Sequence, residues 1–261
     1  MSLYRGVGLV VESLESRCQP AGTVTVLQSG GIVRLLGDAA NNDVALTATG
    51  SNTLTIAGLS GTSISGPTTV MGVNRVYLEL GAGADSTSIT APSSFSGQII
   101  ARASPGDDSF NIGNGQYDGS IVVLEQHGND SLVLTSGVFT EPVIIRTGSG
   151  NDNVSSSAST FWRRFELSTS RGSDNVNLST TNFADRAVLH TDDDNDVLTL
   201  TNLVFSTHSR FDLGTGHDQA VLNNVTFPAG KPQSVIIGGL GVDTLSQTAV
   251  AGSLVVRDFF P

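Results

Sequence analysis

An aromatic residue recurs every 22 residues through the middle of this chain, with no insertion or deletion across six periods. The aromatic positions are Phe95, Tyr117, Phe139, Phe161, Phe183, Phe205 and Phe227. Aspartates keep the same spacing, at Asp108, Asp130, Asp152, Asp174, Asp196 and Asp218. A fixed period of this length is the signature of a repeat protein in which each period forms one structural unit. The repeat therefore constrains the architecture of the chain more closely than its activity.

Each period contains two short segments in which apolar and polar residues alternate, as they do in β-strands. One apolar pair follows the aspartate, as Leu198 and Leu200 follow Asp196, and another pair precedes it by seven and nine residues. A Gly-x-Gly-x-Asp turn lies between these segments in several periods, as at residues 148–152. Because the period lacks a helical pattern, it predicts a β-solenoid whose coils pair in parallel about 4.8 Å apart.

We expect an all-β, single-domain, right-handed parallel β-helix with 22 residues in each coil. Asp85, Asp43 and a degenerate turn at residues 61–64 extend the repeat toward the N-terminus, and a further turn at residues 239–243 extends it toward the C-terminus, to about nine or ten coils. The expected divisions are a leader or capping segment at residues 1–22, the β-helix at 23–252 and a C-terminal strand or end segment at 253–261. Apolar residues at helical spacing near the N-terminus predict a short capping helix over the first coil.

The aromatic ladder is predicted to pack inside the solenoid, where stacked rings fix the register of the coils. An exposed aromatic stripe that grips sugar rings is the alternative. The aspartate ladder also has two interpretations, because carboxylates stacked about 5 Å apart repel by roughly 1–3 kcal/mol per pair. Each aspartate could accept backbone N–H groups in an Asx-type turn, or the ladder could bind Ca²⁺ through carboxylate and carbonyl oxygens. The candidate metal ligands are Asp152, Asp174, Asp194, Asp196 and Asp218.

Composition argues against several classes of partner. The net charge is −11 and only 14% of the residues are charged. We expect no nucleic-acid partner, because phosphate binding needs clustered Lys and Arg. No segment approaches the length of a transmembrane span, and the apolar run at residues 7–11 is too short for an ordinary signal peptide. The single cysteine, Cys18, cannot form an internal disulfide and does not report the compartment.

A catalytic role is not expected from this sequence. A polysaccharide-active β-helix enzyme would need paired carboxylates, or a base beside Lys or Arg, in a groove built by long loops. The corners of this repeat are short and regular, and its histidines are dispersed. A smaller ladder with the same period consists of Arg164, Arg186 and His208. It is interpreted either as a stripe that binds anions or sugar acids, or as a solvated edge that balances nearby acids.

The segment at residues 10–21 reads Val-Val-Glu-Ser-Leu-Glu-Ser-Arg-Cys-Gln-Pro-Ala. It resembles the Val-Glu-x-Leu-Glu-x-Arg-Cys-x-Pro-Ala leader of many surface and secreted proteins of planctomycete bacteria, in which Gly-Asp-rich β repeats commonly follow. The resemblance implies an extracellular or cell-surface location and supplies no catalytic residue. The Gly-x-Gly-x-Asp turns are also similar to the calcium-binding repeats of secreted toxins, which place two such turns in each coil where this chain has one.

Together these features predict an extracellular structural or adhesive protein that associates with itself. Its C-terminal segment, residues 254–261, is apolar and has no evident cap. End-to-end contacts that do not close would produce a fibre or a surface layer. A Ca²⁺-dependent binding module is the first alternative and a polysaccharide-active enzyme is the second. Cell-surface polysaccharide is the partner expected besides the protein itself.

Overall fold

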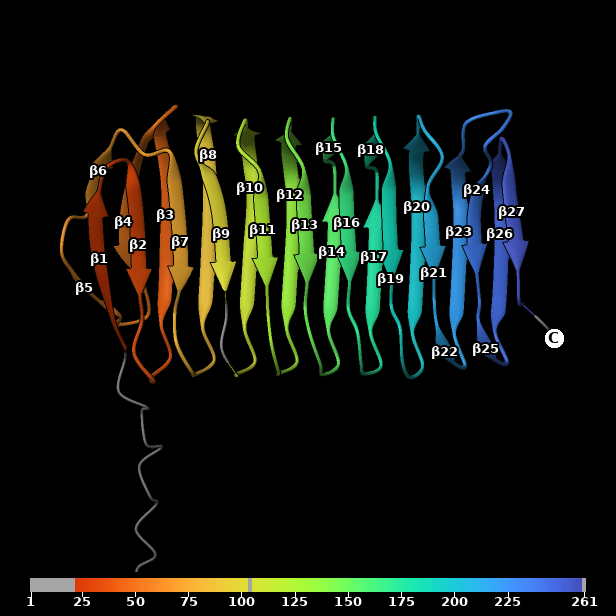
Figure 1. Ribbon diagram of the computed structural model, residues 1–261, viewed down its shortest axis with the longest axis horizontal. Helices are drawn as coiled ribbons and strands as arrows, with labels where there is room; N and C mark the ends of the chain where they lie inside the picture. Colours follow the sequence, from red (N-terminus) through yellow and green to blue (C-terminus); the bar gives the residue numbers. More distant parts are fainter. Residues whose placement is uncertain (1–21, 103–104, 260–261) are drawn as a thin grey trace, which may run out of the picture.

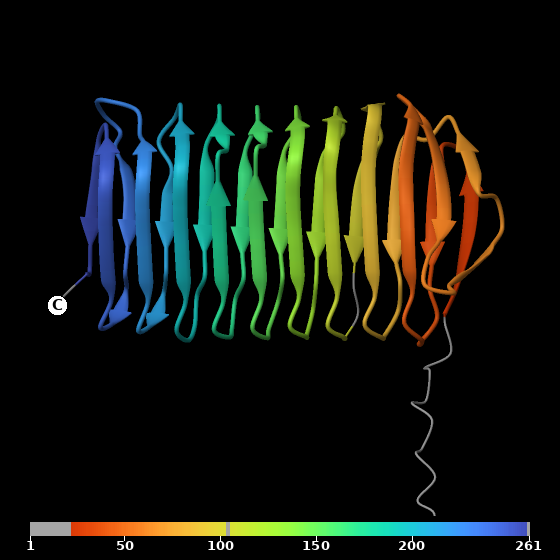
Figure 2. The same cartoon turned by 180° about the vertical axis from the view of Figure 1, so that it is seen from behind.

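The computed structural model describes residues 22–102 and 105–259, and every regular element within these ranges is a β-strand. The strands form one elongated stack of about eight coils that winds in the right-handed sense (Figure 1). Strands on one side of the stack run in the opposite direction to those on the other side, as the view from behind also shows (Figure 2). The predicted all-β solenoid is therefore confirmed.

Two long sheets and one short pair of strands account for all of these elements. Sheet A contains, in order along the stack, β5 (Ser63–Ser65), β1 (Thr23–Ser29), β2 (Ile32–Leu36), β7 (Arg75–Glu79), β9 (Gln98–Arg102), β11 (Ile121–Leu124), β13 (Val143–Arg146), β16 (Phe165–Ser168), β19 (Ala187–His190), β21 (Arg210–Asp212), β24 (Ser234–Ile237) and β27 (Leu254–Arg257). Sheet B contains β6 (Thr69–Met71), β4 (Thr53–Gly58), β3 (Asp43–Gly50), β8 (Ser86–Phe95), β10 (Ser109–Tyr117), β12 (Ser131–Phe139), β14 (Asn153–Ser157), β15 (Thr160–Phe161), β17 (Asn175–Ser179), β18 (Asn182–Phe183), β20 (Val197–Phe205), β23 (Gln219–Thr226) and β26 (Thr244–Ala251). The short pair is β22 (Thr215–Gly216) and β25 (Leu240–Gly241).

The register between neighbouring coils follows the sequence period. In sheet B, Val154 of β14 lies between Leu132 and Val176, its equivalents one period away. Val176 is buried inside the stack, whereas the adjacent Asn175 and Asn177 are exposed, because successive side chains of a strand point to opposite faces. Equivalent positions therefore stack on one another, which explains why the period tolerates no change of length.

The seven aromatic side chains of the ladder lie in the core, and none is more than 2% exposed. From Tyr117 to Phe227 the centroids of successive rings are 4.8–5.3 Å apart and their planes are within 14° of parallel. The single hydroxyl proton of Tyr117 is shared between the carbonyls of Ile89 and Gly113, at 3.0 and 2.8 Å, so its polar end is satisfied inside the stack. The rings thus form one continuous stack along the core of the solenoid.

The N-terminal end is closed by antiparallel strands, which differ from the parallel coils. β1 pairs with β2, and β4 pairs with both β3 and β6, in antiparallel fashion. The two-residue turn Gly30–Gly31 has φ values of 56° and 79°, which favour a tight hairpin because the twist of such a turn matches that of the strands. These hairpins contain residues that the sequence pattern predicted to form coils. The solenoid therefore has about eight coils, close to the nine or ten predicted. The capping helix predicted within residues 1–22 falls almost wholly outside the described residues.

The last described coil, at the C-terminal end of the stack, has described neighbours on one side only. The last strands are β26 in sheet B and β27 in sheet A, and each pairs with a single neighbour, β23 and β24 respectively. Residues packed against the core in this coil are only partly buried, namely Leu245, Val250, Leu254 and Phe259. Residues 254–257, within the predicted C-terminal strand or end segment, form β27, the last strand of sheet A.

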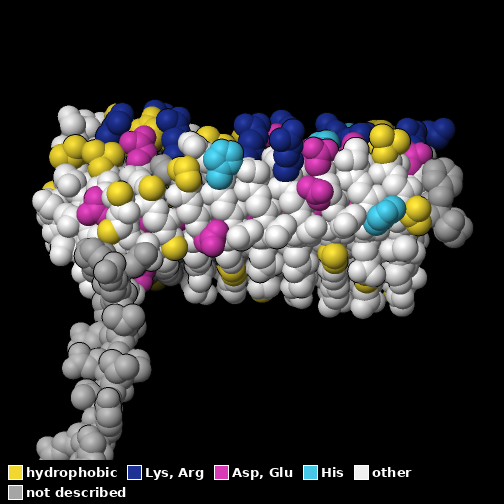
Figure 3. Space-filling model, turned by 90° about the horizontal axis from the view of Figure 1, so that it is seen from below, with side chains coloured by type: hydrophobic (Ala, Val, Ile, Leu, Met, Phe, Trp, Pro, Cys, Tyr) yellow, Lys and Arg dark blue, Asp and Glu magenta, His cyan; other side chains and the backbone are white. Residues whose placement is uncertain are grey.

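The outer faces of the two sheets differ in chemistry. The strands of sheet B from β8 to β26 carry mainly Ser, Thr, Asn and Gln on this face, with exposed valines such as Val138 and Val204, and no charged residue. Arginines gather instead on sheet A, and Figure 3 shows the Lys and Arg side chains along the upper edge of its view, the side on which sheet A lies.

Candidate functional site

The turns between sheet A and sheet B hold a column of buried aspartates. Oδ1 of each aspartate accepts the backbone N–H of the equivalent residue in the preceding coil, as Asp174 accepts the amide of Asp152 at 2.8 Å. The same bond, at 2.8–2.9 Å, recurs along the whole column. The members of this aspartate column are Asp85, Asp108, Asp130, Asp152, Asp174, Asp196, Asp218 and Asp243. The aspartates therefore accept backbone N–H groups, as one interpretation predicted, but they join neighbouring coils instead of closing their own turns.

Burial changes the charge state of this column. None of its side chains is more than 3% exposed, and Oδ2 of each has no hydrogen-bond partner within the described residues. Loss of hydration on burial raises the pKa of Asp108 to about 7 and that of Asp196 to about 8. Part of the column therefore carries protons near neutral pH. Those protons reduce the repulsion that a stack of ionised carboxylates would suffer.

A second hydrogen-bonded ladder lies one residue before the column and runs the opposite way. Here each side chain accepts the amide of the following coil: Asp107 from Asn129 at 2.7 Å, and Asn129 from Asn151 at 2.8 Å. Farther along the stack, Asn195 accepts the amide of His217 at 2.7 Å, and His217 Nδ1 accepts that of Val242. This ladder is not among the features predicted from the sequence, although Asp or Asn recurs before the aspartate at a 22-residue spacing in several coils.

Four of the five predicted metal ligands lie in the aspartate column, namely Asp152, Asp174, Asp196 and Asp218. The fifth, Asp194, is exposed at the edge of the turn. Within residues 22–102 and 105–259, no group of three or more His, Cys, Asp or Glu side chains is arranged to hold a metal ion. Calcium binding by this chain stays a prediction.

Glu125 is a further buried acid, five residues before Asp130 of the column. In the next coils this position holds Thr147, Thr169 and Thr191, whose hydroxyls donate to carbonyls of the following coil. Glu125 is 8% exposed, and neither carboxyl oxygen has a hydrogen-bond partner in the described part of the chain. Burial, with the nearby carboxyl of Asp130 as a further cause, raises the pKa of Glu125 to about 9. Glu125 is therefore uncharged at neutral pH.

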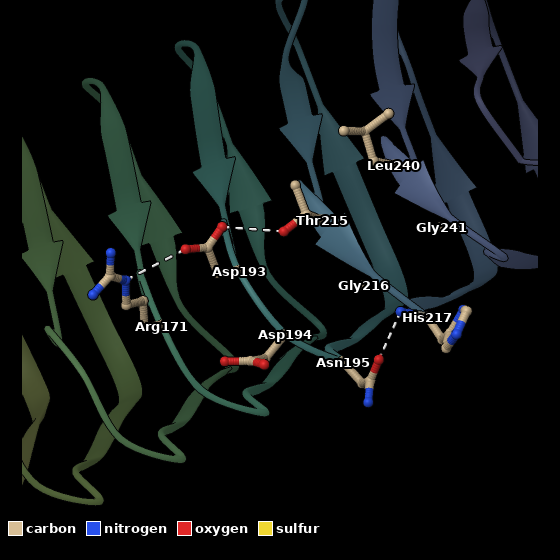
Figure 4. Close-up of a pocket in the computed structure, with 9 residues that line it drawn as sticks. All are labelled: Arg171, Asp193, Asp194, Asn195, Thr215, Gly216, His217, Leu240 and Gly241. Carbon is tan, nitrogen blue, oxygen red and sulfur yellow. Dashed lines mark hydrogen bonds and ion pairs between the residues drawn. The ribbon is translucent and has the colours of Figure 1, made fainter.

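A hollow at the surface lies on the edge formed by the last four turns of the stack, where the side chains point outward from the turns (Figure 4). It has a volume of about 640 Å³ and is open to solvent. Its centre is Asp193, whose carboxylate accepts from Arg171 Nε at 3.4 Å and from the hydroxyl of Thr215 at 3.1 Å. Other residues that line it are Asp194, Asn195, Gly216, His217, Leu240 and Gly241.

The turn beside this hollow departs from the glycine pattern of its neighbours. Asp192 and Asp194 hold left-handed backbone conformations, with φ of 69° and 81°, at the positions that Gly148 and Gly150 occupy two coils earlier. Aspartate tolerates this conformation better than most residues because its short side chain can form local hydrogen bonds. The hollow offers a shallow polar surface with an arginine and two acids outside the column. The expectation that this chain has no catalytic role stays a prediction.

Comparisons with protein-family models, with curated proteins and with solved structures find no match to this chain. In the part of the chain that the structure describes, no helix has the length and hydrophobicity needed to cross a membrane.

Proposed function

We propose that this chain is an extracellular structural or adhesive β-solenoid that associates with itself through its C-terminal coil. The location rests on the resemblance of residues 10–21 to a leader of secreted and surface proteins. The association rests on one observation, the contrast between a closed N-terminal end and an open C-terminal end. Under this proposal the interior columns are structural, and the chain performs no catalysis.

Within the described residues, the C-terminal end presents two strand edges that pair with no further strand and core residues that are only partly buried. β26 and β27 contain no Pro or Lys, residues that commonly prevent edge strands from pairing with other chains. A hollow of about 410 Å³ at this end is lined by Leu245, Val256 and Phe259, among others. Asp243 ends the aspartate column, so its amide meets no carboxylate from a further coil within the described residues. These features favour burial of the last coil against another chain.

The closed end offers much less for such pairing. Its outermost strands, β5 and β6, have three residues each, and short edge strands are poor templates for strand addition. A fibre needs complementary surfaces at both ends, whereas a two-fold pair needs only one surface that fits itself. Pairing of two C-terminal ends matches β26 with β26 and β27 with β27, in the antiparallel arrangement that is slightly the more stable. We therefore favour a pair of chains over the fibre expected from the sequence.

The size of the last coil agrees with such an interface. Residues 239–259 make up this coil, and one side of a standard protein interface comprises roughly 20–30 residues. Its exposed apolar side chains include Leu240, Val242 and Val256. Burial of each would contribute up to about 1.5–3 kcal/mol relative to full exposure, and less in proportion to its existing burial.

Light scattering during size-exclusion chromatography tests this proposal. We expect twice the chain mass of 27.0 kDa for the unmodified protein and the single-chain mass for Val256→Lys, because a charge at this edge would be buried without a partner. Val204→Lys is the matched control, since Val204 is 44% exposed and Val256 43%, and Val204 lies on the long side of the stack. A single-chain mass for the unmodified protein at every concentration would contradict self-association. Masses that grow without limit would support a fibre instead of a pair.

A further inference from the structure

The cationic residues of this acidic protein are concentrated on one surface. Of the 13 Lys and Arg residues in the chain, 11 lie within the described ranges, and eight of these belong to the outer face of sheet A or its immediate edge. They are Arg34, Arg75, Arg102, Arg146, Arg164, Arg186, Arg210 and Arg257. We name this surface the arginine face; in the view of Figure 3 its cations form the dark band along the upper edge.

The strand register spreads these arginines along the whole stack. Arg102 and Arg146 occupy the same row, two coils apart, because Leu124 pairs with both of them. Arg164 and Arg186 lie one coil apart, just before β16 and β19. Coils repeat at about 4.8 Å, so the face extends over roughly 40 Å. The result is a flat surface with guanidinium groups at intervals along the solenoid axis.

Several of these guanidinium groups are free to bind a ligand. Glu166 contacts Arg146 at 3.6 Å and also pairs with Arg164, so part of the charge is neutralised within the face. By contrast, Arg102, Arg186 and Arg257 form no ion pair within the described residues and are exposed. Free cations on one face of a chain with a net charge of −11 are a local feature that the overall composition conceals.

We propose that the arginine face binds an acidic polysaccharide that lies along the solenoid axis. A linear polyanion meets one coil after another, so weak contacts repeated along the stack add up. The planar guanidinium group binds carboxylate or sulfate oxygens through two parallel hydrogen bonds, which gives each contact a defined geometry. A flat surface without a deep groove suits a ligand that is held along its length rather than enclosed.

An anionic membrane surface is a less suitable partner. The aliphatic side chains between the arginines, such as Ile100, Val122 and Ile144, are half-buried among their neighbours and project little for insertion into lipid. The uncharged outer face of sheet B lacks the cations that either ligand needs. The proposal supplies the adhesive part of the proposed function and does not depend on the pairing of C-terminal ends.

Binding of polygalacturonate, a polymer of sugar acids, tests this inference. We expect the unmodified protein to bind it at low ionic strength and to release it as salt is added, because exposed charges are screened. Arg102→Gln with Arg186→Gln should weaken binding by about tenfold, as two charge-assisted contacts are lost. The matched control is Arg171→Gln with Lys231→Gln, which removes the same charge from exposed sites off the face and should leave the affinity nearly unchanged.

The remaining outcomes separate this proposal from its competitors. Equal weakening by both double variants, or equal binding of uncharged dextran, would overturn it. Binding to vesicles that contain anionic lipid, with none to polygalacturonate, would assign the face to a membrane and also overturn it. Val256→Lys removes none of the arginines of the face. Its affinity for polygalacturonate therefore reports on the arginine face independently of self-association. The two proposals can therefore fail independently.

Discussion

Phe161 illustrates how one ring holds neighbouring coils together. Its ring lies 4.8 Å from that of Phe139, 5.1 Å from that of Phe183 and 4.7 Å from the tilted ring of Phe165. Phe161→Ala should lower the free energy of unfolding by about 3–5 kcal/mol, because the cavity would lie between packed coils. The adjacent Trp162 is 57% exposed, and Trp162→Ala should change it by less than about 0.5 kcal/mol. Urea unfolding measures both, and equal losses would contradict a core role for the ring.

Glu125 makes stability depend on pH. Its pKa rises from 4.5 in the unfolded chain to about 9 in the folded one, so between these values the folded state holds a proton that the unfolded state has released. The free energy of unfolding should therefore fall as the pH rises from about 5 to about 9. The raised pKa values of Asp108 and Asp196 act with the same sign.

Thermal unfolding across this pH range tests the assignment to Glu125. Glu125→Gln keeps the size of the side chain and has no proton to lose, so the fall in melting temperature should become shallower. It should not vanish, because the aspartate column also contributes. Glu141→Gln is the control at an exposed glutamate and should leave the slope unchanged. An unaltered slope in Glu125→Gln would show that another group is responsible.

Single residues differ in how far the sequence reveals them. The aromatic and aspartate positions are repeated, so their period exposes them without any structure. Glu125 occurs once in a position otherwise held by threonines, and no pattern distinguishes it from a surface glutamate. Its burial depends on which side chains at this point of the coil point inward, and only the three-dimensional structure shows that.

The aspartate column is an element that joins coils through hydrogen bonds. Asp174→Asn keeps an oxygen that can accept the amide of Asp152, and it also removes a buried carboxyl, so stability should be retained. Asp174→Ala leaves that amide without an acceptor and should cost about 1–3 kcal/mol. Urea unfolding compares the two variants. If asparagine proved as damaging as alanine, and Ca²⁺ raised the melting temperature of the unmodified protein, a metal site would replace this account.

The terminal elements were the least predictable part of the fold. The regular coils could be predicted from the period, because equivalent residues pack in the same way in each successive coil. Before Asp85 the period fails, and the hairpins depend on local turn chemistry, such as the consecutive glycines at residues 30 and 31. The two glycines are visible in the sequence and favour a hairpin, but this part of the chain was predicted to form further coils.

At the scale of the whole molecule, function lies where the repeat ends or where its outer face changes. The interior columns set length and register. The open C-terminal coil and the arginine face provide the two surfaces proposed for association and for adhesion. The apolar C-terminal segment of the sequence already suggested the surface for association. The arginine face could not be predicted in the same way, because it depends on which side chains of the strands point outward. The ladder predicted from the sequence, Arg164, Arg186 and His208, includes only two of the eight arginines of that face.

The outline of single particles in the electron microscope tests the central claim most directly. One solenoid of about eight coils is roughly 40 Å long, and two joined at their C-terminal coils would form a rod of about 80 Å. We predict such paired rods for the unmodified protein and single rods for Val256→Lys. Single rods alone for the unmodified protein would contradict self-association through the C-terminal coil, and long filaments would contradict its pairing with itself.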